Sequence, residues 1–267
     1  MELTDFLILG ILQGVTEWLP VSSSGQSMLA MIDILSIRPE IALKLAIYLH
    51  IGSLLAVIVK FRKDIMKSLS KFKEDKLFYF VIFSTIFTGV VGIPIYMGMK
   101  SFLKLFTKKG EIITIFIGIF LIITGLVLYI SKRRFGTRRI KNIKIKDMVI
   151  SGIAQGFTII PGISRSGITV SVLLLLGFEQ DIALKLSFLM SIPAVIGAVF
   201  IESIQGDIIT FDIFDIYGIF VGIFVAFITG YMTIEGLIKF SKRVRFDTFC
   251  IIFGLLTIIL TIIFILL

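Results

Sequence analysis

The sequence is poor in cysteine, histidine and charged side chains, and each scarcity narrows the kind of protein it encodes. Cys250 is the one cysteine, so no disulfide can form within the chain and the redox compartment stays open. His50 is the one histidine, which leaves a single imidazole for any catalytic role. Charged residues make up 17% of the 267 residues and hydrophobic ones 57%. With a mean hydropathy of +1.05, this composition excludes an ordinary soluble domain.

Long apolar stretches predict about six transmembrane helices, since crossing a bilayer takes roughly 20 helical residues. The predicted spans are Ile41–Val59, Leu77–Met99, Ile112–Ser131, Ile182–Ile201, Ile216–Ile234 and Thr248–Leu267. Glu2 and Asp5 stand where a secretory signal would carry basic residues, so we expect no cleavable signal. We therefore expect an all-α, polytopic membrane protein that forms one integral membrane domain over residues 1–267.

Basic side chains dominate the loops between these spans and give a net charge of +9. In a soluble protein this charge would suggest nucleic acid, but here it reads as a topology signal, so we expect no nucleic-acid partner. The densest run of basic residues is Lys132–Lys146. If it is cytoplasmic and each predicted span crosses the membrane once, then Lys60–Lys76 is also inside, and both termini and the acidic loop from Glu202 to Asp215 are outside. The lysines of Lys100–Lys109 disagree with this scheme. We expect Lys44 and Lys185, near the starts of spans, to snorkel.

Two pairs of apolar runs are too short to cross the membrane. Phe6–Val15 and Met28–Leu35 flank TEWLPVSSSGQ, and Met148–Ile160 and Ile168–Phe178 flank a bend that contains PGISRSGIT. Short helices that meet at a bend rich in Pro, Ser and Gly predict re-entrant hairpins, whose irregular backbone must be buried in protein or line a wet cavity. By the charge count, the first hairpin enters from outside and the second from the cytoplasm.

An internal repeat supports this inversion. QGVTEWLPVSSSG begins at Gln13 and QGFTIIPGISRSG begins at Gln155, an offset of 142 residues, and IALKL recurs at an offset of 141. We predict two halves, about 1–140 and 141–267, with inverted topology. In such folds the ligand site lies near mid-membrane, where broken helices of the two halves meet. Both bends should therefore face each other.

Arg165 is the most costly residue of the second bend, because a charge deep in hydrocarbon costs about 2.5–3.5 kcal/mol or more and marks a functional site by default. Glu17 in the first bend is its natural partner. Phosphoryl transfer needs a cationic clamp, amide donors, and a base or metal ligand beside a nucleophile. We assign Arg165 as the clamp, Glu17 as base or metal ligand, and Ser23 as nucleophile or water-positioner. A purely structural salt bridge between the hairpins is the alternative for the charged pair.

Other polar residues of the two bends complete the predicted site. Gln13 lies one helical turn before Glu17, so it joins the carboxylate on one face, although a core amide would look the same. His50 is a further candidate, with a packing role as its alternative. The predicted substrate-binding residues are Gln13, Ser22, Ser24, Gln26, Gly162, Ser164, Ser166 and Thr169.

These motifs resemble a known family over essentially the whole chain. Gln13, Glu17 and TEWLPVSSSG resemble the (E/Q)xxxE and PVSS signatures, and PGISRSGIT resembles the PGxSRSxxT signature, of the undecaprenyl-diphosphate phosphatases associated with bacitracin resistance. The family's functional residues match Glu17, Ser23, Ser164, Arg165 and Thr169. Two positions depart from the commonest form: Gln13 replaces a glutamate, and Gln26 stands where many members have histidine.

The resemblance implies an enzyme that hydrolyses a C55 polyprenyl diphosphate to the monophosphate carrier and inorganic phosphate, which recycles the lipid used for cell-wall synthesis. It also implies a divalent cation, Mg²⁺ or Ca²⁺, with Glu17 as its ligand, and a site that opens to the outer face of the cell membrane. We expect the lipid and the bilayer as partners, and we count a homodimer among the predicted arrangements. The rival is a transporter or flippase of a polyprenyl phosphate, since inverted repeats with broken helices are transporter architecture.

Overall fold

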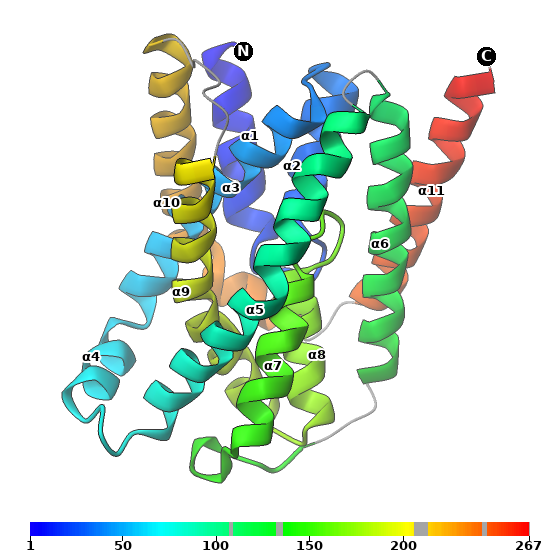
Figure 1. The fold of residues 1–267 in the computed structure, drawn as a ribbon. Coiled ribbons are helices and arrows are strands. Elements are labelled where there is room, and N and C mark those ends of the chain that lie inside the picture. Colours follow the sequence, from blue (N-terminus) through cyan, green and yellow to red (C-terminus); the bar gives the residue numbers. More distant parts are fainter. Residues whose placement is uncertain (107–108, 132–135, 206–212, 242–244, 267) are drawn as a thin grey trace.

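The computed structural model describes residues 1–106, 109–131, 136–205, 213–241 and 245–266 (Figure 1). Within these ranges the chain is helical, apart from a bridge between Arg138 and Phe178. The elements are α1 (Leu3–Thr16), α2 (Ser23–Leu29), a π-helical turn η1 (Ala30–Ile34), α3 (Pro39–Lys60), α4 (Arg62–Ser70), α5 (Lys76–Leu105), α6 (Gly110–Ser131), a 3-10 turn η2 (Ile140–Asn142), α7 (Ile145–Phe157), α8 (Arg165–Leu175), α9 (Gln180–Gln205), α10 (Ile213–Ser241) and α11 (Phe246–Leu266).

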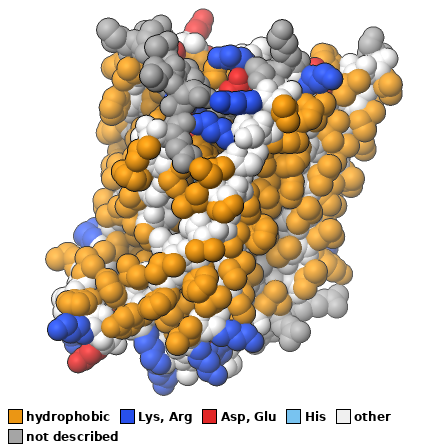
Figure 2. Space-filling view, in the orientation of Figure 1, with side chains coloured by type: hydrophobic (Ala, Val, Ile, Leu, Met, Phe, Trp, Pro, Cys, Tyr) orange, Lys and Arg blue, Asp and Glu red, His pale blue; other side chains and the backbone are white. Residues whose placement is uncertain are grey.

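In the described part of the chain, six helices are long and apolar enough to cross a membrane: α3, α5, α6, α9, α10 and α11. The prediction of six spans is confirmed. Hydrophobic side chains cover the middle of the face in Figure 2, whereas Lys and Arg gather toward its two ends. Two helices run well past their predicted ends: α5 continues to Leu105 and α10 to Ser241. In α5, Lys100 and Lys104 are good helix formers although they end the apolar stretch.

Both termini lie at one end of the helix bundle, while α4 and η2 lie at the other end (Figure 1). The basic connector that contains α4 is therefore opposite the termini, as the charge count predicted. Several charged residues of the loops lie outside the described residues: Lys108, Lys132, Arg133, Arg134, Asp207, Asp212, Lys242 and Arg243.

Close glycine contacts hold the short helices against long ones. Helix α1 packs against α10, and α7 packs against α5. A Cβ atom on Gly14 would lie 2.8 Å from the backbone oxygen of Ala226, and one on Gly156 would lie 2.6 Å from the Cβ of Val91. Only small residues allow such close approach between helices in a membrane. Gly14 and Gly156 are separated by the 142 residues of the repeat.

The bend before α8 and the bend before α2 end in the same kind of helix cap. The Ser22 hydroxyl accepts a hydrogen bond from the Gly25 amide at 3.3 Å, and the Ser164 hydroxyl accepts one from Gly167 at 3.1 Å. Serine at this position satisfies an amide that has no acceptor in its own helix. Repeat-related serines thus start both helices in the interior of the bundle.

The second bend is tied to α6. Gly162 has a φ of +96°, a left-handed conformation that suits glycine, and its carbonyl accepts a hydrogen bond from the Thr124 hydroxyl at 3.2 Å. The amide of Ser164 donates to the same hydroxyl at 3.1 Å. One side chain of α6 therefore holds both sides of the turn that precedes Arg165.

The two intramembrane lysines each lie close to a carboxylate of another helix. The Lys44 side chain is 9% exposed and its Nζ lies 3.9 Å from a carboxylate oxygen of Glu202 on α9. Lys185 donates to Asp64 on α4 at 2.5 Å. The snorkelling prediction is wrong for Lys44, because a buried carboxylate on a neighbouring helix compensates its charge more directly than the membrane surface would.

Candidate active site

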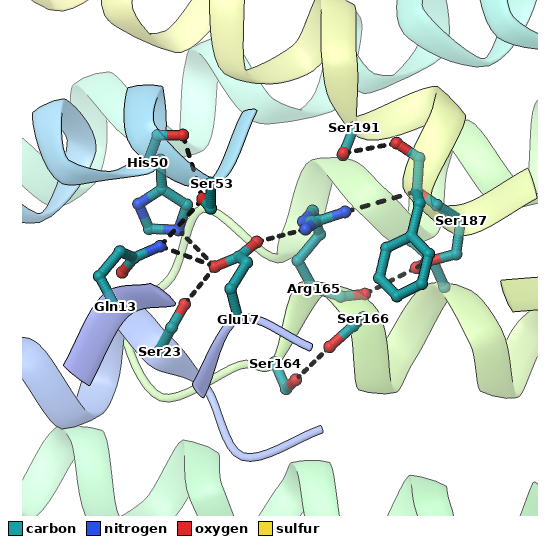
Figure 3. Close-up of polar contacts among 12 residues, drawn as sticks. Gln13, Glu17, Ser23, His50, Ser53, Ser164, Arg165, Ser166, Ser187 and Ser191 are labelled. Atoms are coloured by element: carbon teal, nitrogen blue, oxygen red, sulfur yellow. Dashed lines mark hydrogen bonds and ion pairs between the residues drawn. The ribbon is translucent and has the colours of Figure 1, made fainter. Parts of the chain in front are cut away.

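Glu17 is the centre of the site, and it lies directly after α1 with its side chain 4% exposed. Its Oε2 accepts hydrogen bonds from the Gln13 amide at 2.8 Å and from the Ser23 hydroxyl at 2.6 Å (Figure 3). Its Oε1 accepts one from the guanidinium of Arg165. The two bends therefore meet through one carboxylate, as the repeat predicted.

His50 approaches the same carboxylate from α3. Its Nε2 lies 3.3 Å from Glu17 Oε2, and its Nδ1 lies 2.6 Å from the carbonyl oxygen of Ala46. Both ring nitrogens thus face acceptor oxygens, and only the imidazolium form can donate to both. In that form His50 would be a second cationic group beside the carboxylate.

Arg165 is the first residue of α8, and its side chain keeps donor capacity for a ligand. Nη2 donates to Glu17, whereas Nη1 makes only a 3.4 Å contact with the carbonyl of Ser187. The buried Nε has no hydrogen-bond partner among the described residues. A guanidinium presents five N–H donors in a fixed plane. A negatively charged ligand would satisfy the donors that the protein leaves over.

Thr169 and Ser187 support the backbone of Arg165 rather than the ligand space. The Thr169 hydroxyl lies 2.7 Å from the carbonyl oxygen of Arg165 and 2.6 Å from the Ser187 hydroxyl. Both side chains are fully buried. They hold the first turn of α8 against α9, which fixes the direction of the guanidinium.

A cavity of about 120 Å³ opens beside this network. Of the described residues that line it, Glu17, His50 and Arg165 are the ionisable ones, and with a protonated His50 their charges sum to one positive charge. Its remaining polar lining consists of Ser22, Ser23, Ser24, Thr88, Gln155, Thr158, Ser164 and Ser166. The cavity is polar and cationic where the bends meet and apolar where Leu43, Ile47 and Ile159 contribute.

Most predicted site residues come together at this cavity. Gln13 and Thr169 are buried directly behind its wall, and the carbonyl of Gly162 is turned to Thr124. Gln26 is different: its amide donates to the Val21 carbonyl at 3.3 Å, and it lines another cavity between α2, α6 and α11. Side chains two positions apart on a helix point to nearly opposite sides, so Gln26 cannot point in the same direction as Ser24. The prediction that Gln26 lies at the substrate is not supported by its position.

Several residues near the site were not predicted, and Gln155 and Ser53 are two of them. Gln155 lines the cavity, and its amide lies 3.1 Å from the Thr88 hydroxyl and 3.2 Å from the Met190 carbonyl. Its equivalence to Gln13 in the repeat was a usable signal. Ser53 on α3 lies 3.3 Å from the Gln13 amide nitrogen. No signal marked it, because a serine inside an apolar helix is common.

A metal ion finds few protein ligands here. Among the described residues, no three His, Cys, Asp or Glu side chains form a group that could hold one. Glu17 supplies the one carboxylate, and the buried Oε1 of Gln13 has no hydrogen-bond partner in the described chain. Mg²⁺ is usually held by one or two carboxylates together with substrate phosphates and water. The donor set therefore suits a cation that binds together with a phosphorylated ligand.

Comparison with known proteins places this geometry in context. The sequence matches the family model described as bacitracin resistance protein BacA over residues 6–259. A protein named undecaprenyl-diphosphatase from Methanothrix thermoacetophila is 47% identical over 261 residues, which cover 98% of each chain. One of the same name from Methanococcoides burtonii is 40% identical over 270 residues, covering 97% of this chain and 98% of that one. Another, from Sulfurisphaera tokodaii, is 38% identical over 246 residues, 91% of each chain.

Proposed function

The chain belongs to the bacitracin resistance protein BacA family, and from this premise we propose that it hydrolyses undecaprenyl diphosphate to the monophosphate and inorganic phosphate. It is a multi-pass membrane enzyme whose substrate is a lipid. One observation carries the assignment: Arg165, with a buried Nε that no described residue satisfies, borders a cavity beside the hydrogen-bonded Ser23 and Glu17. That arrangement combines an anion clamp with an oxygen nucleophile.

Arg165 binds the diphosphate in this proposal. Its spare N–H groups meet the non-bridging oxygens of the terminal phosphoryl group, where charge builds up in the transition state. The amides of Arg165 and Ser166 add to this, because the first amides of a helix have no acceptor within it and attract anions. A protonated His50 contributes further positive charge without touching Arg165.

Ser23 and Glu17 form the attacking pair. The hydroxyl lies 2.6 Å from the carboxylate, within the range expected for a nucleophile and its base. The Ser23 oxygen, or a water held in its place, attacks the terminal phosphorus, and the lipid monophosphate leaves with the electrons of the broken P–O bond. If Ser23 attacks, a water then hydrolyses the phosphoserine, which releases inorganic phosphate and restores the hydroxyl. Glu17 takes the proton. Because Glu17 also accepts from Gln13, His50 and Arg165, it has one fixed orientation.

We expect Ser23→Ala to lower kcat about a thousandfold if the hydroxyl itself forms the bond to phosphorus, as loss of an activated nucleophile does. Phosphate release by purified protein in lipid nanodiscs measures the effect. Ser101→Ala, on the exposed side of α5, is the matched control and should keep wild-type turnover. A loss of tenfold or less in Ser23→Ala would exclude the serine as nucleophile and leave water as the attacking group.

A divalent cation, Mg²⁺ or Ca²⁺, is part of the proposal. Glu17 and the free amide oxygen of Gln13 would hold it together with the diphosphate. When bound, the cation neutralises charge on the phosphoryl oxygens. We expect EDTA to reduce phosphate release at least about tenfold and added Mg²⁺ to restore it. Unchanged release after exhaustive chelation would remove the metal from the proposal and leave Arg165 as the sole clamp.

The experiment that tests the function is the release of inorganic phosphate from undecaprenyl diphosphate by the purified protein. Release well above that of protein-free vesicles supports the proposal. A protein that binds the lipid and moves it between leaflets without any phosphate release would instead be the transporter that the repeat also suggested. The relatives' names favour the phosphatase.

We infer further that α1–α2 and α7–α8 are re-entrant hairpins of an inverted repeat with halves about 1–140 and 141–267. Three contacts support this: α1 packs on α10 as α7 packs on α5, and α6 packs on α11. In the predicted halves, α5 corresponds to α10 and α6 to α11. Helix α1 also starts at the end of the bundle that holds the termini, and α7 at the other end (Figure 1). The proposal further places the protein in the plasma membrane with its site facing outward; a homodimer remains a prediction.

A further inference from the structure

A second cavity of similar size lies between α5 and α9, with a volume of about 130 Å³. Small or apolar side chains make up most of its wall: Gly89, Gly92, Ile93, Ile159, Pro193, Ala194, Gly197, Ala198 and Ile201, with Thr85, Thr88 and Tyr96. None of the described residues that line it is charged. In Figure 2, white atoms of backbone and small residues show along the seam between α9 and α5. We call this space the α5–α9 groove.

The α5–α9 groove adjoins the active-site cavity. Five residues line both spaces: Thr88, Gly92, Ile159, Ala194 and Ala198. At its other side the groove reaches the surface that faces hydrocarbon, where Ile93 is 39% exposed. A molecule bound at Arg165 could therefore extend through the groove into the bilayer without crossing a polar layer.

A larger cavity in the described chain offers no such route. It has a volume of about 900 Å³ and lies between α2, η1, α6 and α11, with Asp33, Arg38 and Glu111 in its wall. No described residue lines both this cavity and the active-site cavity. Volume alone therefore does not show which cavity could hold the rest of a ligand bound at Arg165. The residues that a cavity shares with the active-site cavity are the better guide.

We propose that the α5–α9 groove holds the part of the isoprenoid tail next to the diphosphate, and that Gly89 and Gly197 set the width available to it. This inference rests on the proposed function. The volume is far too small for a whole C55 tail, so only the first isoprene units occupy the groove and the rest lies among lipid tails. The groove's apolar wall matches an isoprenoid and excludes the diphosphate, which orients the lipid head-first toward Arg165.

Gly197 is the decisive position. A Cβ atom there would have no neighbour within 4 Å, so helix packing would allow a residue with a side chain at this position. At Gly89 the nearest atom to an added Cβ is 3.8 Å away, on Ile93 of the same helix. Glycine inside a helix costs about 1 kcal/mol relative to alanine. Glycine at both positions weakens its helix and leaves open space in the groove. Occupation of that space by a ligand would explain why no larger residue fills it.

The test compares Gly197→Phe with Gly98→Phe. Gly98 lies on α5; like Gly197, it has no atom within 4 Å of an added Cβ, but it lines neither the groove nor the active-site cavity. With undecaprenyl diphosphate in nanodiscs, we expect Gly197→Phe to raise KM about tenfold or more, as the loss of a few buried methylene contacts would, with kcat within about twofold of wild type. Gly98→Phe should leave both constants unchanged.

Gly89→Leu is the second variant. It narrows the groove from the α5 side, opposite Gly197, and we expect it to raise KM as well. If the unaltered enzyme turns over and both groove variants keep its KM, the inference is overturned and the proposed function still stands. A wild-type protein without any turnover would overturn the proposed function instead.

Photo-crosslinking tests the groove independently of turnover. A farnesyl diphosphate with a benzophenone on its first isoprene unit should label peptides of α5 and α9, and Gly197→Phe should lose most of that label. Labelling confined to α6 and α11, around the larger cavity, would overturn the inference even if phosphate release proceeds normally.

Discussion

Arg165→Ala is expected to lower phosphate release from undecaprenyl diphosphate by a factor on the order of 10³–10⁵, the range seen when an arginine that stabilises a transferring phosphoryl group is lost. Arg165 is the one described cation besides His50 that lines the cavity, and its Nε has no described partner. Both KM and kcat should worsen, because the guanidinium meets the diphosphate in the ground state and more strongly in the transition state.

The Arg165 experiment needs a control for folding, since removing one member of a buried pair costs about 3–5 kcal/mol by leaving the other charge uncompensated. Arg165→Lys keeps the charge but loses the planar donor fork, and we expect it to retain only a small part of the activity. Arg139→Ala is the matched surface control, because Arg139 is 68% exposed at its side chain and bonds Glu179. Wild-type turnover in a folded Arg165→Ala protein would refute the clamp.

With Mg²⁺ at saturating concentration, Glu17→Gln is expected to lower kcat on the order of 10²–10⁴, the contribution typical of a general base, while KM stays equal or falls. The neutral amide cannot take the proton of the attacking oxygen. It also leaves Arg165 and a protonated His50 unneutralised, so the cavity becomes more positive and should bind the diphosphate at least as well. This separation of kcat from KM distinguishes a base from a purely structural carboxylate.

Glu235→Gln is the control for this change, since Glu235 is 66% exposed and pairs with Lys60 on the surface. Its steady-state constants should match wild type. A melting curve in detergent checks that Glu17→Gln is folded, and Glu17→Asp tests whether a shorter carboxylate that keeps the charge recovers some turnover. If Glu17→Gln raises KM with kcat unchanged, Glu17 contributes to binding and a different group must accept the proton.

The transmembrane spans and the meeting of the two bends were predictable from the sequence. Ser22 and Ser164 cap repeat-related helices, and Gly14 and Gly156 face long helices at the same repeat offset. These features depend on local spacing and on a duplicated pattern, both of which a single sequence carries. The pairing of Glu17 with Arg165 followed, because a buried charge requires a nearby opposite charge.

Other parts of the site were not predictable. Gln26 follows Ser24 by two residues yet faces another cavity, and Lys44 meets Glu202 rather than the membrane surface. The sequence left His50 open between packing and catalysis, and only the structure shows that its two nitrogens face Glu17 and Ala46. Each outcome depends on the rotation of one helix against another, which residue types along one helix do not specify.

The sequence by itself therefore determined the membrane class, the six spans and the charged and hydroxyl groups of the site, because hydrophobic transfer and local hydrogen bonding act residue by residue along the chain. Only the tertiary structure decided which donors share the carboxylate of Glu17, and that a second cavity between α5 and α9 shares part of its wall with the active-site cavity. Those properties arise where surfaces of distant segments meet, and a cavity is defined by the space that side chains from several helices together leave unfilled.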